Sequence, residues 1–444
     1  MYTDGAGLYQ IPIPAGWANQ STPEMAHFIN PAATANLYAL VVEGADVQAG
    51  IQAALSRINA DFSAQPVQTM EIPLPSGDRW TQNVYMLPDG MLAAVLGRVD
   101  NDLTYVIAIF AAQDVLAAES AIINQTLLGH TLTNAAPTTP VTAAYVNTES
   151  FTEQEIVLTS GTFELPATLS LPAGEGTFPA VVIVHGSGPN DRDGTLGLNK
   201  PYRDLAQGLA SQGIAVLRYD KRTYVYREPI PGFTVDDEVT NDALAAIALL
   251  RGNDRIDSAR IFVIGHSLGA MFALRIAERD PALAGAVLMA GTPFSFDQVL
   301  STQINYLRSL DANADVGGLD VLVEVLKSIR DGADPVTAFG GDTNQAAYWA
   351  SMMDYVPGDT AQSLETPMLI LQGERDYQVT MSDFTTWQEL LGERENVTLV
   401  SYPTLNHIFM ALGSLDRMAV PTDYSEPGFM DAEVIADIVE WINQ

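Results

Sequence analysis

The chain has 444 residues, too many for one ordinary domain at about 100–200 residues per domain, so we expect two domains. Its 54 acidic residues outnumber 21 basic residues, and the net charge of −33 argues against a nucleic-acid or anionic-membrane partner. The absence of cysteine excludes disulfides, zinc–thiolate sites and a cysteine nucleophile.

The start of the chain, Met-Tyr-Thr-Asp-Gly, lacks the basic segment and apolar run of a signal peptide. Two expectations therefore stay open: a cytoplasmic protein, or a secreted or cell-envelope protein whose signal peptide has been removed. No apolar run reaches the length of about 18 residues that a membrane span needs, so none is predicted. The oligomeric state is left open by the sequence.

Residues 1–132 are predicted to form a small α+β accessory domain. Strand-like runs occupy residues 37–42, 81–87, 91–99 and 104–110, and helical patterns occupy residues 47–62 and 113–127. His27 and His130 lie here without a serine and carboxylate arrangement, so we expect packing or surface roles for both. Residues 133–149, rich in Pro, Thr, Ala and Asn without periodicity, are predicted to be a linker.

Residues 150–444 alternate between strand and helix patterns. Predicted strands occupy residues 155–159, 163–171, 180–184, 215–219, 261–264, 285–289, 368–371 and 397–402. Predicted helices occupy residues 202–212, 237–250, 270–277, 382–391 and 431–442. Fully apolar inner strands alternating with helices predict an α/β fold with a doubly wound, mostly parallel sheet covered on both faces.

The turn after residues 180–184 reads His185-Gly186-Ser187-Gly188-Pro189, and its glycines allow the backbone to approach a ligand closely. Polar residues follow it: Arg192, Asp193, Lys200 and Tyr202. Their side chains either contact the substrate or form a salt-bridged loop that fixes the turn, and the sequence leaves both interpretations open. The stretch 220–222, Asp-Lys-Arg, is expected to be a structural ion-pair network.

Residues 265–269 read Gly-His-Ser-Leu-Gly between an apolar strand pattern and a helical pattern. Gly-x-Ser-x-Gly in that position is typical of a nucleophile elbow, so Ser267 is the predicted nucleophile. The oxyanion formed in acyl transfer needs backbone N–H donors. We expect them to be the N–H groups of Leu268 and Ser187, with Gly186 and Gly188 as alternatives to Ser187.

Residues 292–366 interrupt the alternation with helical segments between the sixth and seventh predicted strands. An insertion there would lie over the carboxyl ends of the strands, where ligands bind in open α/β sheets. We therefore predict a helical cap, with a helical elaboration that only packs on the domain as the alternative.

A serine nucleophile needs a histidine base and a carboxylate that holds the histidine. His185 ends an inner strand, and the ring of His266 should point away from the serine hydroxyl, which leaves His407 in the loop after the last predicted strand. The loop after the preceding strand offers Asp376, with Glu374 as the competing acid. The order serine, acid, histidine is that of the α/β-hydrolases.

Several spaced motifs carry a resemblance to a known family. They are His185-Gly-Ser-Gly-Pro-Asn-Asp-Arg-Asp193, Asn199-Lys-Pro-Tyr-Arg203, Arg218-Tyr-Asp-Lys-Arg-Thr223, the elbow, Leu371-Gln-Gly-Glu-Arg-Asp-Tyr-Gln-Val379 and Leu405-Asn-His407. Over residues 150–444 the chain resembles bacterial α/β-hydrolase esterases related to dienelactone hydrolases and acyl-thioester hydrolases. The resemblance implies hydrolysis of short-to-medium acyl esters, without a metal or organic cofactor, by Ser267, Asp376 and His407. Dienelactone hydrolases use a cysteine nucleophile, which this chain lacks.

Three other functions compete with a carboxylesterase. A thioesterase or acyltransferase would use the same triad. A peptidase of the prolyl-oligopeptidase type is disfavoured because residues 1–132 are too few for a β-propeller of seven four-stranded blades. A binding protein that retains the hydrolase fold is disfavoured by the joint presence of triad and oxyanion turn.

Overall fold

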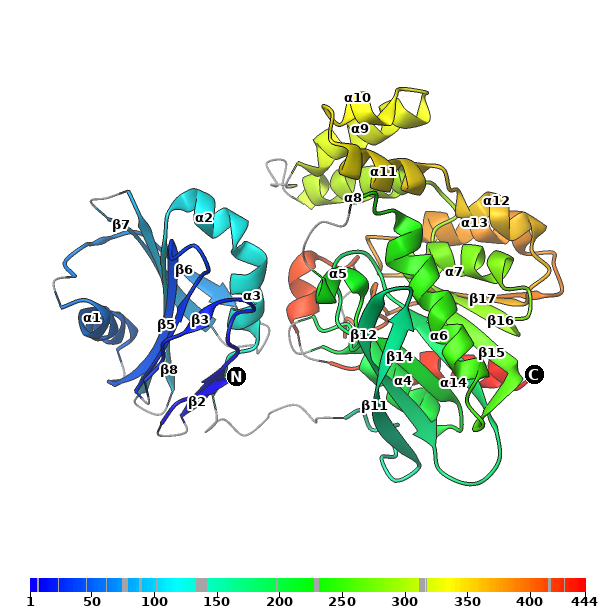
Figure 1. The fold of residues 1–444 in the computed structure, drawn as a ribbon, viewed down its shortest axis with the longest axis horizontal. Coiled ribbons are helices and arrows are strands. Elements are labelled where there is room, and N and C mark those ends of the chain that lie inside the picture. The colour runs from blue at the N-terminus through cyan, green and yellow to red at the C-terminus, as the bar shows by residue number, and fades with distance from the viewer. Residues whose placement is uncertain are drawn as a thin grey trace. The chain divides into compact units, whose positions relative to one another are not determined.

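A computed structural model divides the chain into two compact units (Figure 1). The first unit is Met1–Val141 with Tyr424–Pro427, and the second is Thr142–Asp423 with Gly428–Gln444. The structure describes residues 1–5, 8–22, 24–44, 46–60, 62–73, 79–87, 90–100, 103–132, 142–196, 199–226, 231–310, 316, 318–413, 417–426 and 428–444. Residues 142–149 of the predicted linker fall in the second unit, and its residues 133–141 lie outside the described chain. No described helix combines the length and apolar character that a bilayer crossing requires.

The first unit is built on a seven-stranded antiparallel sheet of order β3-β4-β5-β9-β8-β7-β6. Its strands are β3 (Ala18–Asn19), β4 (Met25–Ile29), β5 (Ala35–Glu43), β6 (Pro66–Pro73), β7 (Arg79–Met86), β8 (Leu92–Asp100) and β9 (Leu103–Ala111). A smaller sheet joins β1 (Tyr2–Thr3), β2 (Tyr9–Ile11) and β10 (Thr131–Leu132). The helices are α1 (Val47–Ile58), α2 (Gln113–Ala118) and α3 (Ser120–Leu128). The predicted strands and helices of this region are therefore present, while β1–β4, β6 and β10 were missed.

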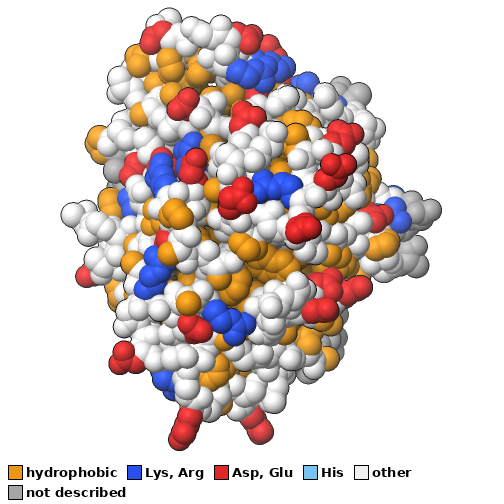
Figure 2. Space-filling model, turned by 90° about the vertical axis from the view of Figure 1, so that its right-hand side faces the viewer, with side chains coloured by type: hydrophobic (Ala, Val, Ile, Leu, Met, Phe, Trp, Pro, Cys, Tyr) orange, Lys and Arg blue, Asp and Glu red, His pale blue; other side chains and the backbone are white. Residues whose placement is uncertain are grey.

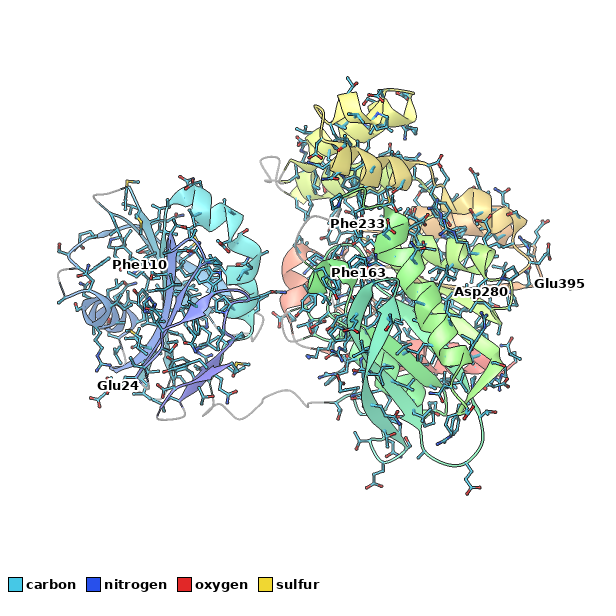
Figure 3. All side chains as sticks on the ribbon, in the orientation of Figure 1. Glu24, Phe110, Phe163, Phe233, Asp280 and Glu395 are labelled. Carbon is cyan, nitrogen blue, oxygen red and sulfur yellow. The ribbon has the colours of Figure 1, made fainter. Side chains whose placement is uncertain are left out.

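Both faces of the seven-stranded sheet are covered. Alternate residues of one strand belong to different cores: Leu40 of β5 packs with Ile51 of α1, whereas Leu37 and Ala39 pack with Ile123 of α3. Phe110, labelled in Figure 3, contacts the ring of Phe62 edge-on at 6.3 Å between centroids. The first unit therefore has two apolar cores of its own, one on each face of the sheet.

The second unit contains an eight-stranded sheet of order β11-β12-β14-β13-β15-β16-β17-β18. Its strands are β11 (Phe151–Ser160), β12 (Phe163–Pro172), β13 (Phe178–Val184), β14 (Ala215–Tyr219), β15 (Ile256–His266), β16 (Gly285–Met289), β17 (Met368–Gly373) and β18 (Val397–Tyr402). The β11–β12 and β12–β14 pairs are antiparallel, and the pairs from β14 through β18 are parallel. This topology confirms the predicted doubly wound, mostly parallel sheet.

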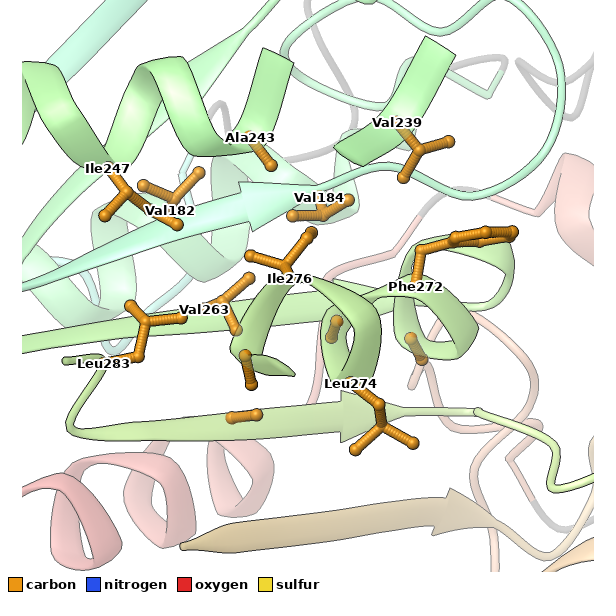
Figure 4. Close-up of a cluster of buried hydrophobic side chains, with 14 of the residues drawn as sticks. Val182, Val184, Val239, Ala243, Ile247, Val263, Phe272, Leu274, Ile276 and Leu283 are labelled. Atoms are coloured by element: carbon orange, nitrogen blue, oxygen red, sulfur yellow. The ribbon is translucent and has the colours of Figure 1, made fainter. Parts of the chain in front are cut away.

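Helices cover both faces of this sheet, as the alternation predicts. They are α4 (Pro201–Ser211), α5 (Arg222–Val225), α6 (Asn241–Arg251), preceded by a π-helical turn η1 (Asp236–Thr240), α7 (Leu268–Arg279), α13 (Met381–Leu391) and α14 (Ala432–Ile442). A short 3₁₀ turn, η2, spans Pro421–Ser425. Val182 and Val263 of the sheet pack against Ile276 of α7 and Ile247 of α6 (Figure 4). Their neighbours in the strands, such as Ile183 and Ile264, pack in the separate core that includes α4 and α14.

Between β16 and β17 the alternation of strands and helices is interrupted, and the described residues form five helices. They are α8 (Phe296–Leu310), α9 (Leu319–Arg330), α10 (Pro335–Ala338), α11 (Thr343–Met353) and α12 (Pro357–Ser363). We call α8–α11 the cap, and it has a core of its own that includes Leu300, Ile304, Val323 and Leu326.

On the face drawn in Figure 2, acidic side chains are scattered among basic and apolar ones instead of gathering in one patch.

Candidate active site

Four candidate residues follow the carboxyl ends of neighbouring parallel strands. Ser187 lies after β13, Ser267 directly after β15, Asp376 after β17, and His407 after β18. Because parallel strands end at one edge of the sheet, the topology brings these positions to the same edge. This is the edge at which doubly wound proteins bind their ligands.

Ser267 occupies a strained turn between β15 and α7. Its φ of 56° and ψ of −118° lie outside the regions that a non-glycine residue ordinarily adopts. The glycines on either side permit the turn: a Cβ on Gly265 would lie 2.2 Å from the Gly269 carbonyl oxygen, and one on Gly269 would lie 2.1 Å from the Val184 carbonyl oxygen. The spacing Gly-x-Ser-x-Gly is thus required by close backbone packing, which is the geometry of a nucleophile elbow.

His407 and Asp376 form a buried pair. The Asp376 Oδ2 atom lies 2.6 Å from His407 Nδ1, and both side chains are almost fully buried. The other carboxylate oxygen accepts hydrogen bonds from the backbone N–H groups of Gln378 at 2.7 Å and Val379 at 3.2 Å. Asp376 is therefore held so that it fixes the histidine ring through Nδ1 and leaves Nε2 as the atom available to a nucleophile.

Glu374, the competing acid, points elsewhere. Its Oε1 atom accepts a hydrogen bond of 2.9 Å from the Ser401 hydroxyl on β18. The geometry therefore favours Asp376 over Glu374 as the partner of His407.

The turn after β13 lies beside the nucleophile, because a Cβ on Gly186 would be 3.3 Å from Ser267 Cβ. The Gly186 N–H donates to the Tyr202 hydroxyl oxygen at 2.9 Å, so this N–H is already used. The Ser187 N–H has no acceptor among the described residues. Leu268 is the first residue of α7, where N–H groups lack intrahelical partners. The geometry thus counts against Gly186 as an oxyanion donor and leaves Ser187, with Gly188 as its alternative, beside Leu268.

The polar residues that follow this turn are paired with protein groups. Arg192 contacts both carboxylate oxygens of Asp220, at 3.0 and 3.2 Å, and Lys200 lies 2.8 Å from Asp193. Gly188 offers its carbonyl to Lys221 Nζ at 3.1 Å. These contacts correspond to the salt-bridged loop, the second of the two interpretations, and they count against substrate contacts by Arg192, Lys200 and Gly188.

Tyr202 also departs from a substrate-binding role. Its side chain is 5% exposed, and burial raises the pKa of its hydroxyl. The hydroxyl group lies between the Gly186 N–H and His266 Nδ1, which are 2.9 and 3.0 Å away. It therefore contacts protein groups on both sides, not the space a substrate would occupy.

The stretch Asp220-Lys221-Arg222 forms ion pairs, as the sequence predicts. Lys221 Nζ contacts Glu238 Oε1 at 2.7 Å and the Gly186 carbonyl at 2.8 Å. Arg222 pairs with Asp242 and lies 4.1 Å above the ring centre of Phe163, which Figure 3 labels. Lys221 supports the turn at its carbonyl groups while its charge is neutralised by Glu238.

The remaining histidines of the second unit lack a carboxylate partner. Burial, reinforced by nearby positive charge on Lys221, lowers the pKa of His185 to about 3. Burial and the neighbouring His407 lower the pKa of His266 to about 3. Both rings are therefore neutral at physiological pH.

The cap contacts the loop that carries the acid. Tyr306 of α8 stacks on Tyr377, the residue after Asp376, with ring centres 4.9 Å apart. Gln303 Nε2 donates to the Gln378 carbonyl at 3.2 Å, and Tyr348 of α11 donates to Glu238 at 2.5 Å. The insertion thus packs against the loop after Asp376 and against Glu238, and both the cap and a helical elaboration that only packs on the domain remain interpretations.

The long-range pairs Lys221–Glu238 and Tyr202–His266 were missed by sequence reasoning. Their partners lie on different elements, and no local spacing or periodicity signals such a contact. Among the described residues, no three His, Asp or Glu side chains gather closely enough to hold a metal ion.

Comparison with known proteins assigns the family. The model of the serine aminopeptidase S33 family matches residues 179–411, which include β13 except its first residue, the strands β14 to β18 and the three candidate catalytic residues. Among the curated proteins, esterase EstD of Thermotoga maritima is 39% identical over 298 residues, covering 67% of this chain and 69% of that protein.

Two further relatives are more distant. The bis(hydroxyethyl) terephthalate hydrolase of Streptomyces coelicolor is 33% identical over 144 residues, covering 31% of this chain and 39% of that protein. The solved structure of an esterase from Pyrococcus furiosus has 20% identity and a TM-score of 0.42, and the match covers 66% of this chain and 91% of that one. Taken with the sheet topology and the elbow, the family match means that this chain is a hydrolase and belongs to the serine aminopeptidase S33 family of α/β-hydrolases.

Proposed function

We propose that the protein is a serine carboxylesterase that hydrolyses short-to-medium acyl esters through an acyl-enzyme on Ser267. The observation that carries the proposal is the Asp376–His407 pair, in which Oδ2 lies 2.6 Å from Nδ1. This pair lies at the same edge of the sheet as the Ser267 elbow. The likeness to esterase EstD supports an ester as the substrate class.

In the acylation step, Ser267 Oγ attacks the ester carbonyl carbon and His407 Nε2 takes the hydroxyl proton. Negative charge develops on the carbonyl oxygen, and the N–H groups of Leu268 and Ser187 stabilise it. The positive end of α7, at Leu268, acts in the same direction. When the tetrahedral intermediate collapses, the C–O bond to the alcohol breaks, and His407 returns the proton to the departing alkoxide.

In the deacylation step, His407 removes a proton from water as the water oxygen attacks the acyl carbon. The second tetrahedral intermediate collapses by releasing Ser267, which regains a proton from His407, and the carboxylic acid leaves. Asp376 stays ionised throughout and stabilises the imidazolium that forms in each step.

The Ser267→Ala variant tests the assignment. Hydrolysis of a p-nitrophenyl ester series from acetate to palmitate should fall by at least about 10⁴-fold, because the nucleophile is lost. The thermal midpoint should stay close to that of the wild type, since the substitution removes one oxygen from a turn. Undiminished hydrolysis in this variant would refute the assignment of Ser267.

The same measurements separate the competing functions. Wild-type activity confined to acyl-CoA thioesters would indicate a thioesterase, and transfer to an added alcohol in place of water would indicate an acyltransferase. Hydrolysis of aminoacyl p-nitroanilides in preference to esters would indicate an aminopeptidase, the activity for which the family is named. No turnover of any of these substrates would favour a binding protein with the hydrolase fold.

A further inference from the structure

A buried hydrogen-bonded bridge joins the turn after β13 to the loop that carries His407. The Gly186 N–H donates to Tyr202 Oη at 2.9 Å, Tyr202 Oη lies 3.0 Å from His266 Nδ1, and His266 Nε2 lies 2.8 Å from the His407 carbonyl oxygen. Tyr202, on α4, and His266, the residue before the nucleophile, are 5% and 8% exposed.

The proton positions in this bridge follow from the chemistry of its ends. A carbonyl oxygen can only accept, so His266 Nε2 must carry a hydrogen and donate it to His407. With Nε2 protonated in a neutral imidazole, Nδ1 is an acceptor, and the Tyr202 hydroxyl donates to it. The lone pairs of the same hydroxyl accept the Gly186 N–H. Each group has one consistent role, so the bridge has a single direction from Gly186 to His407.

The neutral state that this arrangement needs is maintained by burial, which holds the pKa of His266 at about 3. The Tyr202 ring is fixed by edge-on contacts with His185 and His266, at 5.3 and 5.7 Å between ring centres. The rings of His266 and His407 are themselves 4.7 Å apart. Ring contacts therefore hold both side chains of the bridge, and the His266 ring lies beside the ring of the candidate base, His407.

The carbonyl groups of the same turn are held by different residues. Lys221 Nζ donates to the carbonyls of Gly186 and Gly188, and Asn190 Nδ2 donates to the carbonyl of Ser187 at 3.0 Å. With the carbonyls bound on one side and the Gly186 N–H bound by Tyr202, the orientation of the next peptide group is fixed. The N–H in that peptide group belongs to Ser187, the proposed oxyanion donor.

We infer that Tyr202 and His266 are positioning residues. They hold the Ser187 N–H and the His407 ring in the correct position relative to Ser267. The inference rests on the proposed function, because it concerns the oxyanion donor and the base of that reaction. The hydrogen bonds of both side chains are made within the bridge, and none of them goes to the Ser267 hydroxyl or the His407 ring. Their effect is on geometry, and catalytic groups lose efficiency steeply when displaced by as little as about 1 Å.

The Tyr202→Phe variant removes only the hydroxyl group at the centre of the bridge. We expect kcat for p-nitrophenyl butyrate to fall by about 10- to 100-fold with KM within about 2-fold of the wild-type value, because substrate binding does not use the bridge. Affinity for a trifluoromethyl ketone, which forms an oxyanion adduct with the serine, should fall by the same factor as kcat.

Tyr402→Phe is the matched control. The Tyr402 hydroxyl donates to Asp437 Oδ2 of α14 at 2.7 Å, so the control loses one hydroxyl and one hydrogen bond that are not part of the bridge. Its kcat should equal the wild-type value, while its thermal midpoint should fall about as far as that of Tyr202→Phe. If Tyr202→Phe retained kcat, or if both variants lost kcat and ketone affinity equally, the positioning role would be overturned.

His266→Leu provides a second measurement on the same bridge, and on its own it tests the bridge if Tyr202→Phe does not fold. His266→Leu removes both hydrogen bonds and should reduce kcat at least as much as Tyr202→Phe. The double variant should then be no worse than His266→Leu alone, because both changes act on one bridge. Multiplicative losses in the double variant would show that the two side chains act separately and would contradict the inference.

The proposed function and this inference fail in different ways. If the wild type hydrolysed no ester, or if Ser267→Ala retained activity, the proposed function would be wrong. A wild type that is active and silenced by Ser267→Ala, together with a Tyr202→Phe variant of unchanged kcat and ketone affinity, would reject the bridge alone.

Discussion

The two units bury very different amounts of charge. Among the described residues of the first unit, Asp4 is the only carboxylate that is buried, and no lysine or arginine is. Among the described residues of the second unit, ten charged side chains are buried, namely Asp204, Arg218, Asp220, Lys221, Arg222, Glu238, Asp242, Asp297, Asp376 and Asp383. Its histidines His185, His266 and His407 are buried as well.

Burial of charge costs stability unless each group is paired, so a domain built for stability alone avoids it. Two of the buried charged groups support the candidate site: Lys221 holds the turn after β13, and Asp376 holds His407. The difference places most of the buried charged side chains of the described residues in the unit that contains the candidate site.

The largest effect is expected from Asp376→Asn. An asparagine amide can donate to Nδ1 and so favours the tautomer in which Nε2 carries the proton and cannot act as a base. In serine proteases this change lowers kcat by about 10⁴-fold with the geometry intact, and we expect a loss of the same order here. The measurement is kcat for p-nitrophenyl butyrate.

Glu374→Gln is the control for Asp376→Asn. Glu374 lies two residues earlier in the same loop and accepts from Ser401, so its replacement should leave kcat near the wild-type value. Equal losses in the two variants would contradict the assignment of Asp376 as the acid.

Lys221→Met should destabilise the second unit by about 3–5 kcal/mol, because it leaves Glu238 as an uncompensated buried charge. Urea unfolding measures the loss. Adding Glu238→Gln to Lys221→Met should recover part of it, since the stranded charge is then removed.

Lys327→Met is the matched lysine variant. Lys327 pairs with Glu324 at 3.0 Å on the surface of α9, where such a pair contributes about 0.5 kcal/mol or less. A similar unfolding midpoint for Lys221→Met and Lys327→Met would show that the buried ion pair is not important for stability.

Mild acid should destabilise the second unit through its neutral histidines. The pKa of His185 and the pKa of His266 are both about 3 in the folded chain, against about 6.5 for an unperturbed histidine. Below pH about 6.5 the unfolded chain binds protons that the folded chain does not, so stability falls as the pH drops toward 3.

His185→Gln tests this pH dependence. The variant should lose about 1 kcal/mol less than the wild type between pH 7.5 and pH 5.5, as measured by urea unfolding at the two pH values. An identical pH dependence in the two proteins would mean that His185 does not have a lowered pKa in the folded state.

The parallel sheet was predictable because its inner strands are uninterrupted apolar runs. Residues 180–184, 285–289 and 368–371 lie within β13, β16 and β17, and fully buried strands of that kind are recognisable without any partner. The short pairings β1–β2 and β2–β10 involve two or three residues, too few for an alternation to be seen. The predicted helix over residues 113–127 is divided at Glu119 into α2 and α3, a local change that periodicity does not register.

The candidate site likewise contains residues that were predictable from the sequence and contacts that were not. Ser267, Asp376 and His407 could be proposed because each follows a recognisable strand in a known order. The bridge through Tyr202 joins residues 64 positions apart, and its last bond joins residues 141 apart. Contacts of that kind are set by tertiary packing, so they become visible only when the strands are placed beside one another.

The smallest effect is expected from removal of residues 1–141, the N-terminal part of the first unit. Every candidate catalytic residue, the oxyanion turn and the cap lie in the second unit, which has its own apolar cores. The truncated protein should therefore hydrolyse p-nitrophenyl acetate with kcat/KM within about 2-fold of the full chain, since acetate binding needs only the groups around Ser267. A bulky ester measured in parallel tests for substrate contacts by the first unit: a loss confined to the bulky ester would assign it a part in substrate binding. Equal rates on both esters would leave it without one, and a comparable loss on both would mean that the second unit depends on the first for its stability.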